Sequence, residues 1–306
     1  MKKVIVIVGP TASGKTKLSI ELAKKLDGEI VSCDSMQIYK YMDIGTAKPT
    51  VQEMDGIKHH MIDIVLPSEE FSVAKYKDMA KRCIEDILKR GKMPIVVGGT
   101  GLYANALIYN LSFKDTVCDW EYRRKLEKEA KLHGNKYLHD KLKDIDRESY
   151  EKLHENDLKR IIRALEVYKF TGSTITQQSR MSRINPPEYQ YVVFGLTMDR
   201  EKLYERINKR VDIMIESGLI EEVKNIVRLG YKNTRTASCA IGYKEIFAWL
   251  DGKCTYQEAI DKLKMESRRY AKRQITWFKR VENIHMVDAS EDIEDILGYM
   301  ENIISF

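Results

Sequence analysis

The feature of this sequence with the clearest chemical meaning is a glycine-rich loop near its start. The segment Gly9-Pro10-Thr11-Ala12-Ser13-Gly14-Lys15-Thr16 fits the pattern G-x-x-x-x-G-K-[ST]. Its glycines let successive backbone N–H groups point at phosphate oxygens, and the N-terminus of the following helix adds partial positive charge. In this pattern Lys15 reaches the terminal phosphate and the Thr16 hydroxyl ligates Mg²⁺. The loop therefore predicts a phosphate-binding site.

The loop alone does not identify the phosphorylated ligand. Motor ATPases add a strand of apolar residues that ends in an acidic Mg²⁺ ligand. The closest match here, Met61-Ile62-Asp63, is short. A motor ATPase is therefore disfavoured.

A second candidate for chemistry is Asp34, which follows the expected second strand. In open α/β sheets, ligands bind at the carboxyl ends of the strands, so we expect Asp34 beside the phosphate loop. A carboxylate repels phosphate, but it can accept a proton from a nucleophile. The alternative is that Asp34 merely caps the next helix.

The elements that must position these residues alternate between strands and helices. Strands are expected at residues 4–8, 29–33, 94–97 and 191–196, with weaker candidates at 61–65 and 284–287. Apolar residues at helical spacing follow the phosphate loop as far as Leu26, and again cover residues 72–89. This alternation predicts an α/β fold with a doubly wound parallel sheet.

The middle of the chain differs from its surroundings in composition and in the secondary structure that it predicts. From about Lys114 to about Ile184 it is polar and helical, without strand signals. Helices are expected at residues 120–132, 135–142, 146–153 and 157–170, followed by a loop rich in Gln, Ser and Arg. Residues 114–190 therefore predict an all-helical inserted domain. Residues 1–113 and 191–306 predict a phosphate-loop (kinase-like) core with a helical C-terminal part.

Composition narrows the class of protein. Of the 306 residues, 43% are apolar and 32% are charged, which excludes a disordered polyelectrolyte. The aliphatic run at residues 4–8 is far shorter than the roughly 18 residues of a membrane span. We therefore expect a cytoplasmic protein without a membrane partner. Five scattered cysteines, with no C-x-x-C pair, argue against a disulfide framework or a zinc ribbon.

The formal net charge of +6 conceals a basic segment. Residues 264–280 contain seven Lys or Arg and one acid, and an acidic tail follows. Such a helix could track phosphates along a nucleic acid, or it could be a solvated helix offset by the tail.

Together with further segments, these features resemble the tRNA dimethylallyltransferases (tRNA isopentenyltransferases) over nearly the whole chain. The matching segments are Gly9–Thr16, Asp34–Tyr39, Met42–Pro49, His59–Asp63, Val97–Tyr103, Arg163–Glu166, Arg206–Val211, Ile241–Tyr243 and Ala271–Phe278. Residues 43–49 and 272–277 are highly specific, since phosphate-loop kinases in general lack them. The chain has no Cys/His spacing for the C-terminal zinc finger of eukaryotic members, so the bacterial type fits.

The resemblance implies an enzyme that transfers a dimethylallyl group from dimethylallyl diphosphate to N6 of an adenosine in tRNA, releasing diphosphate. That adenosine lies immediately 3′ of the anticodon, so the partner is the anticodon stem-loop. The phosphate loop would hold the diphosphate of a prenyl donor rather than a nucleotide. Mg²⁺ is the implied cofactor, and we expect a monomer.

The resemblance also implies residue roles. Asp34 would accept the N6 proton, Thr16 would hold Mg²⁺ with diphosphate oxygens, and Lys15 and Arg210 would neutralise the leaving diphosphate. The residues implied to contact tRNA are Asp34, Ser35, Met36, Gln37, Thr100, Arg123, Lys159, Arg160, Ile161, Ile162 and Arg163. Lys159 stands where the family usually has Gln, so a neutral amide contact would become a phosphate contact.

The other candidate residues have structural interpretations. His59-His60 lacks a third metal ligand at sensible spacing. Trp277 and Phe278 are expected to pack the last long helix onto the sheet rather than stack on bases. Two alternatives to the transferase stay open from the residues: an ATP-dependent phosphate-loop kinase of a small metabolite, and a non-catalytic RNA-binding module.

Overall fold

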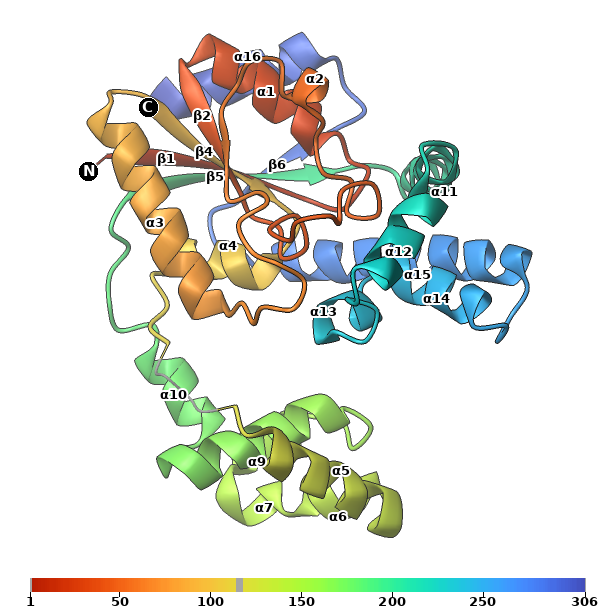
Figure 1. The fold of residues 1–306 in the computed structure, drawn as a ribbon. Coiled ribbons are helices and arrows are strands. Elements are labelled where there is room, and N and C mark those ends of the chain that lie inside the picture. The colour runs from red at the N-terminus through yellow and green to blue at the C-terminus, as the bar shows by residue number, and fades with distance from the viewer. Residues whose placement is uncertain (1, 114–117, 306) are drawn as a thin grey trace. The chain divides into compact units, whose positions relative to one another are not determined.

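The chain forms two compact units, and the sequence of the second interrupts that of the first (Figure 1). In the computed structural model, which describes residues 2–113 and 118–305, the first unit runs up to Ile108 and resumes at Glu188. The second unit is Tyr109–Pro187. It begins and ends slightly earlier than the expected 114–190, and the expected boundary at Lys114 lies outside the described residues. The first segment of the first unit ends with α4 (Gly101–Ile108). The composition of the sequence changes only after this helix, which is why the expected boundary lay later.

The first unit is built on a parallel sheet whose described strands follow the order β3-β2-β4-β1-β5-β6. The strands are β1 (Lys3–Val8), β2 (Gly28–Ser32), β3 (His59–His60), β4 (Met93–Gly98), β5 (Gln190–Thr197) and β6 (His285–Asp288). In the centre of the sheet, Ile5 of β1 lies opposite Ile95 of β4 and Val192 of β5. The side chains of residues 4–8 in β1 are buried because helices cover both faces, as the continuous aliphatic run predicts.

The strand expected at 61–65 is wrong. Only His59–His60 pairs with β2, and Val65 forms an isolated bridge with Tyr39. Met61 and Asp63 adopt left-handed backbone conformations, with φ of 63° and 55°. Such conformations cannot continue a strand, so the chain turns away from the sheet edge.

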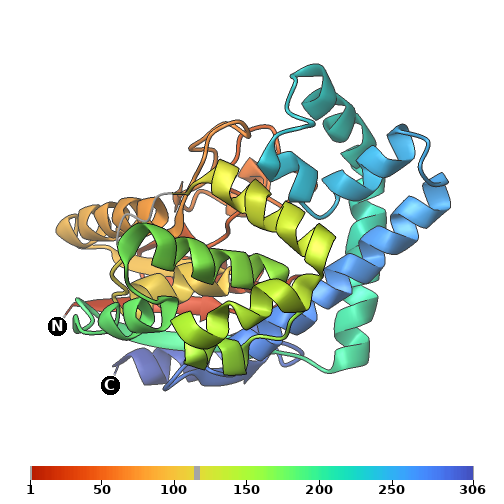
Figure 2. The same cartoon turned by 90° about the horizontal axis from the view of Figure 1, so that it is seen from below.

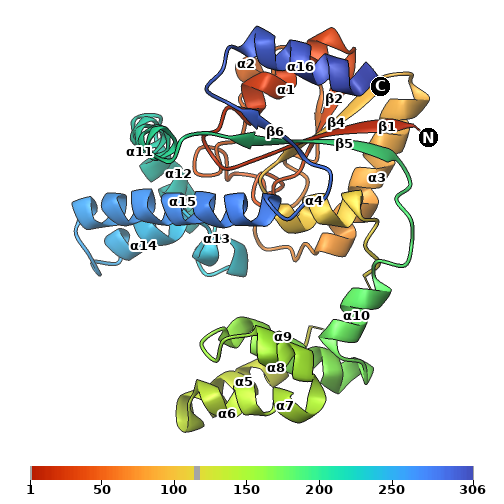
Figure 3. The same cartoon turned by 180° about the vertical axis from the view of Figure 1, so that it is seen from behind.

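Helices cover both faces of the sheet (Figures 1 and 3). On one face, α1 (Lys15–Lys25) packs beside α16 (Ile293–Ser305), and the short α2 (Val51–Met54) lies nearby. On the other face, α3 (Val73–Lys89) packs beside α4. The main core joins the strands to α1 and α16 through side chains such as Leu22, Phe194 and Leu297.

The C-terminal part of this unit is helical, as expected. Its helices are α11 (Arg200–Glu216), α12 (Leu219–Arg228), α13 (Arg235–Cys239), α14 (Tyr243–Leu250) and α15 (Tyr256–Phe278). The long α15 packs against α11 and α14 (Figure 2). At its end Phe278 is buried, and Trp277 packs closely against Gly101 at the start of α4. A second core cluster joins α12, α14 and α15 to the segment that follows β2, through Ile38 and Met42.

The second unit is helical in its described part. Its helices are α5 (Trp120–His133), α6 (Asn135–Asp140), α7 (Leu142–Ile145), α8 (Arg147–Lys152), α9 (Leu158–Thr171) and α10 (Ile175–Met181). The helix expected over 135–142 is broken into α6 and α7. Helix α10 forms where a loop was expected, and a reciprocal capping box between Thr174 and Gln177 starts it.

Among the described residues, no helix is both long enough and apolar enough to cross a membrane.

Candidate active site

The phosphate loop joins the buried β1 to the first turn of α1. Gly14 stands at the N-cap of α1 in a left-handed conformation (φ 90°), which favours glycine. No side chain caps this helix, so the N–H groups of its first turn remain available to an anion. Lys15 Nζ donates to the carbonyl of Pro10 at 2.7 Å, which folds the side chain back over the loop.

The loop opens onto a cavity of about 380 Å³ that gathers the residues expected to be catalytic. Thr11, Lys15 and Thr16 line it from the phosphate loop, Asp34 from the end of β2, and Arg210 from α11. Ser35, Met36 and Gln37, which were expected to touch the target base, line the same cavity. The fold therefore brings Lys15 of the phosphate loop, Arg210 of α11 and the Asp34 carboxylate into one site.

Burial shifts the pKa of three charged groups in this cavity, Lys15, Arg210 and Asp34. It lowers the pKa of Lys15 to about 7, with the nearby Arg210 acting in the same direction and Asp34 opposing it. Burial likewise lowers the pKa of Arg210 and raises that of the Asp34 carboxyl. The charged forms of Lys15 and Arg210 are therefore disfavoured in the free protein. A bound anion would stabilise these charged forms, because it supplies the missing counter-charge.

Asp34 has one oxygen engaged by the backbone. Its Oδ1 accepts the N–H groups of Met36 at 2.8 Å and Gln37 at 3.3 Å. Asp34 therefore caps the turn after β2 rather than the next helix, α2, which begins only at Val51. Neither of these bonds uses Oδ2, so this capping is compatible with a chemical role.

Thr100, at the end of the loop after β4, orders the segment beside Asp34. Its Oγ1 accepts the N–H of Ser35 at 2.9 Å and donates to the Ser35 hydroxyl at 3.2 Å. The Thr100 N–H donates to the Cys33 carbonyl at 3.1 Å. Thr100 thus fixes the backbone of the expected base-contact segment.

Gln274 is a site residue for which the sequence assigned no role. This buried side chain of α15 lines the cavity. Its Oε1 accepts the N–H of Thr11 at 2.8 Å, and its Nε2 donates to the carbonyl of Gly99 at 3.0 Å. It also explains Gly99, where a Cβ would lie 2.1 Å from Gln274 Nε2. The signal available in the sequence was a glutamine within the specific segment 272–277.

The residues expected to contact tRNA from the second unit have different environments. Lys159 and Arg160 are exposed on α9. The side chains of Ile161 and Ile162 belong instead to the core of this unit. Buried side chains offer RNA no surface, so a tRNA contact at Ile161 and Ile162 stays a prediction that their side chains do not support.

Arg123 and Arg163 converge on a buried carboxylate. Glu166 is fully buried and accepts Arg123 Nε at 2.8 Å and Nη2 at 2.7 Å, in a bidentate pair. It also accepts the Asp119 N–H at 3.0 Å and pairs with Arg163. Arg123 therefore joins α5 to α9, whereas Arg163 forms an i,i+3 pair with Glu166 within α9 itself.

The cavity was also tested for the implied Mg²⁺. The described residues contain no group of three or more His, Cys, Asp or Glu side chains that could hold a metal ion. Mg²⁺ in phosphate-transfer sites is bound by few protein ligands, together with phosphate oxygens and water. The Thr16 hydroxyl in the cavity fits that mode. His60 pairs instead with Glu29 at 2.8 Å, and Asp63, the nearest candidate for an acidic Mg²⁺ ligand, pairs with Lys48.

Fold and site define a class: a phosphate-loop α/β protein with a cavity for a phosphorylated ligand and a carboxylate beside it. Residues 37–281 match the family described as IPP transferase. The chain is 58% identical over 291 residues to the tRNA dimethylallyltransferase of Acetivibrio thermocellus (95% of this chain, 93% of the relative). The chain belongs to the IPP transferase family.

Solved structures agree with this assignment. The tRNA isopentenylpyrophosphate transferase of Bacillus halodurans is 48% identical, with a TM-score of 0.75 over 100% of this chain and 96% of that one. A eukaryotic dimethylallyltransferase acting on tRNA is 32% identical, with a TM-score of 0.80 over 100% of this chain and 80% of that one. The family resemblance, fold class and enzyme class expected from the sequence are therefore confirmed.

Proposed function

We propose that this protein transfers a dimethylallyl group from dimethylallyl diphosphate to N6 of the adenosine 3′-adjacent to the anticodon in tRNA, releasing diphosphate. One observation carries the proposal: Lys15 of the phosphate loop, Arg210 of α11 and the Asp34 carboxylate line a single cavity. A prenyl donor with its diphosphate on the loop would present its reactive carbon toward the carboxylate side. The family membership supports the same reaction.

In this proposal the phosphate loop binds the diphosphate and stabilises it as it leaves. The N–H groups of the loop, Lys15 and Arg210 oppose the negative charge that develops when the C–O bond of the donor breaks. Such preorganised charges are worth several kcal/mol in a site that excludes water. Thr16 would hold the Mg²⁺, which supplies further positive charge to the diphosphate oxygens.

Asp34 acts as the base. The exocyclic amine of adenosine is a weak nucleophile, and its nitrogen becomes acidic as the N–C bond forms. Asp34 takes the released proton on Oδ2, while Oδ1 stays bound to the backbone N–H groups of Met36 and Gln37. The adenosine must leave the base stack to reach this carboxylate.

The helical unit contributes RNA affinity. Lys159 and Arg160 present positive charge on the exposed side of α9, which suits the phosphates of the anticodon stem-loop. The cavity carries out the chemistry and the helical unit binds the RNA, so the reaction needs both units.

The test is a product analysis with unmodified tRNA and Mg²⁺, using dimethylallyl diphosphate in one arm and ATP in the other. Nucleosides are then separated and weighed by mass spectrometry. We expect one adenosine per tRNA, 3′-adjacent to the anticodon, to gain a dimethylallyl group while diphosphate is released. Formation of ADP without prenylated adenosine would indicate a kinase, and tRNA binding without any product would indicate an RNA-binding module.

A further inference from the structure

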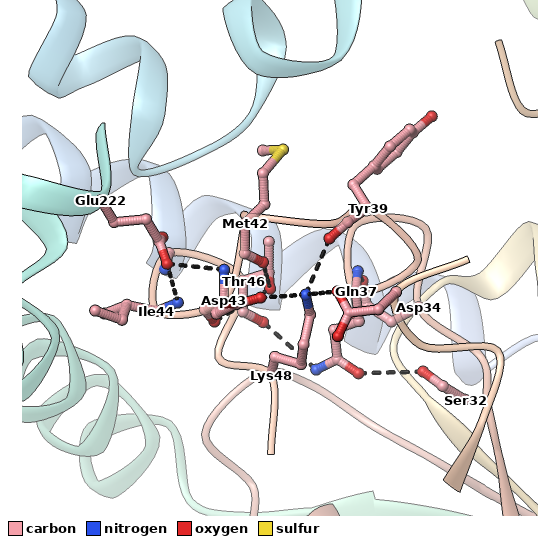
Figure 4. A network of polar contacts seen from close by, with 12 residues as sticks. Ser32, Asp34, Gln37, Tyr39, Met42, Asp43, Ile44, Thr46, Lys48 and Glu222 are labelled. Atoms are coloured by element: carbon pink, nitrogen blue, oxygen red, sulfur yellow. Dashed lines mark hydrogen bonds and ion pairs between the residues drawn. The ribbon is translucent and has the colours of Figure 1, made fainter. Parts of the chain in front are cut away.

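The carboxylate of Glu222, in the first turn of α12, accepts three consecutive backbone N–H groups from a loop far away in the sequence (Figure 4). Its Oε2 accepts Asp43 N–H at 2.9 Å and Ile44 N–H at 2.7 Å. Its Oε1 accepts Gly45 N–H at 2.9 Å and the hydroxyl of Tyr243 at 2.6 Å. Hydrogen bonds to an ionised carboxylate are the stronger kind, so Glu222 ties the loop to α12.

We call residues 42–48 the clamp loop. Gly45 lets it approach α14 closely, since a Cβ there would lie 2.5 Å from the Tyr243 ring. At the other end, Lys48 Nζ donates to the Tyr39 carbonyl at 2.9 Å and pairs with Asp43 and Asp63. The Lys48 side chain is only 5% exposed, so the clamp loop is fixed at both ends.

The clamp loop forms part of the wall of the active-site cavity. Gly45, Thr46 and Ala47 line it, next to Gln37. The Gln37 side-chain Nε2 donates to the carbonyls of Ala47 at 3.1 Å and Thr46 at 3.4 Å. The clamp loop therefore holds the Gln37 side chain in place beside it in the cavity wall.

Gln37 carries this constraint to Asp34. Its Oε1 accepts the Ser32 hydroxyl at 3.1 Å, which anchors the amide to the end of β2. Its backbone N–H donates to Asp34 Oδ1 at 3.3 Å. The chain of contacts from Glu222 to the carboxylate is thus continuous, and Figure 4 shows its members side by side.

We propose that Glu222 is a positioning residue for the base-binding side of the active site. By holding the clamp loop, it fixes Gln37 and, through Gln37, the carboxylate of Asp34. The inference rests on the proposed function. The phosphate loop keeps contacts of its own, from Lys15 to Pro10 and from Gln274 to Thr11. Loss of the clamp should therefore affect use of tRNA and leave donor binding intact.

The test compares Glu222→Gln with Glu221→Gln. Glutamine at 222 replaces one acceptor oxygen by an amide that faces N–H donors. Glu221 is the adjacent residue of the same helix, its side chain is 67% exposed, and it pairs with Lys224. The two variants lose the same charge, but only one loses the clamp.

Three quantities are measured: kcat/KM for tRNA, donor affinity, and hydrogen exchange of the Asp43, Ile44 and Gly45 amides. For Glu222→Gln we expect exchange about tenfold faster and kcat/KM for tRNA about 10- to 100-fold lower. Donor affinity should stay within about twofold. Glu221→Gln should match the wild type in all three.

The outcomes separate the two proposals. If wild-type protein transfers no dimethylallyl group, the proposed function fails and this inference fails with it. If the wild type is active and Glu222→Gln uses tRNA as well as Glu221→Gln does, only the positioning role is overturned, even where the amides exchange faster. If Glu222→Gln does not fold, Tyr243→Phe decides: it removes one donor to the carboxylate and should lower kcat/KM for tRNA about threefold, whereas wild-type efficiency overturns the role.

Discussion

The side-chain oxygen of Gln274 accepts the N–H of Thr11 at 2.8 Å, across 263 positions of the chain. The same amide donates to the Gly99 carbonyl at 3.0 Å. One buried side chain of α15 therefore joins the phosphate loop, which follows β1, to the loop that follows β4. Because the two loops belong to neighbouring parallel strands, Gln274 sets their spacing in the wall of the cavity.

Gln274→Glu should disturb this spacing. The new carboxylate can still accept the Thr11 N–H, but its second oxygen would face the Gly99 carbonyl with no proton between them. An unsatisfied buried polar group costs roughly 1–3 kcal/mol, so kcat/KM should fall about 10- to 100-fold. Steady-state kinetics with dimethylallyl diphosphate and tRNA measure this. Gln257→Glu, at an exposed position of the same helix, should retain near-normal kcat/KM; equal losses in both variants would contradict the bridging role.

Asp34→Asn should abolish most of the chemistry. The amide keeps the size of the side chain but cannot accept the N6 proton, and loss of a general base usually costs about 10² to 10⁴ in rate. Single-turnover measurements at saturating tRNA isolate this step, and tRNA affinity should change by less than about tenfold. Retention of most of the rate would leave Asp34 only its capping role.

The pH dependence of the wild type follows from the same carboxylate. Burial raises the pKa of Asp34, while the N–H groups of Met36 and Gln37 oppose this shift. The ionised form is the active one, so the single-turnover rate should fall as pH drops through that raised pKa. The descent should therefore begin above the ordinary aspartate range and be absent from the residual rate of Asp34→Asn.

The elements that the sequence predicted correctly are those determined by nearby residues. The aliphatic run of β1, the phosphate loop and the helical spacing of α1 are consecutive, so pattern alone reveals them. Asp34 could be placed beside the loop because the carboxyl ends of parallel strands share one edge. The capping box that starts α10 is also local, since Thr174 and Gln177 stand three residues apart in the sequence.

The features that the sequence did not reveal depend on contacts between distant segments. Nothing near Gln274 or Glu222 in the chain indicates that their partners are Thr11 and the clamp loop. Arg123 matches a pattern of RNA contacts, yet its pairing with Glu166 follows from how α5 packs on α9. Such partners emerge only when the helices are placed in three dimensions.

Donor binding should draw a proton onto Lys15. In the free protein its pKa is lowered to about 7, chiefly by burial and then by Arg210. A bound diphosphate adds negative charge and raises that pKa, so affinity is greatest below pH 7 and falls by up to about tenfold per unit above it. Calorimetry at pH 8 in buffers of different ionisation enthalpy should detect uptake of nearly one proton. Lys15→Met should abolish this uptake and Lys17→Met, at an exposed neighbour, should keep it; uptake by Lys15→Met would assign the proton elsewhere.

Glu29 should stabilise the fold at neutral pH. Arg90 Nη2 donates to its Oε2 at 2.7 Å and His60 lies at 2.8 Å, and chiefly the Arg90 pairing holds the pKa of Glu29 at about 2. A depressed carboxyl pKa contributes stability that is present above the unfolded value, near 4.5, and is lost as pH falls toward 2. Glu29→Gln should lower the free energy of unfolding by roughly 2–3 kcal/mol at pH 7 and by much less near pH 2.

Urea denaturation at the two pH values measures this difference. Asp86→Asn is the control, because Asp86 pairs with the same arginine but its side chain is 59% exposed. It should lower the free energy of unfolding by less than about 1 kcal/mol. A Glu29→Gln penalty that is independent of pH would show that packing, rather than charge, is responsible.

Two variants of the helical unit should distinguish a side chain that contacts RNA from one that stabilises the fold. Lys159 is exposed, so Lys159→Ala should weaken tRNA binding and lower the slope of log affinity against log salt by about 1, since one phosphate contact is lost. Arg123→Ala should act differently, because it leaves the buried Glu166 without its bidentate partner. Removing one partner of a buried pair typically destabilises by about 3–5 kcal/mol. Arg123→Ala should therefore lower the midpoint temperature of thermal unfolding, and Lys159→Ala should leave it unchanged. Lys159→Ala should instead lower the salt slope of tRNA binding. A normal salt slope for Lys159→Ala would mean that this face of α9 meets solvent rather than tRNA.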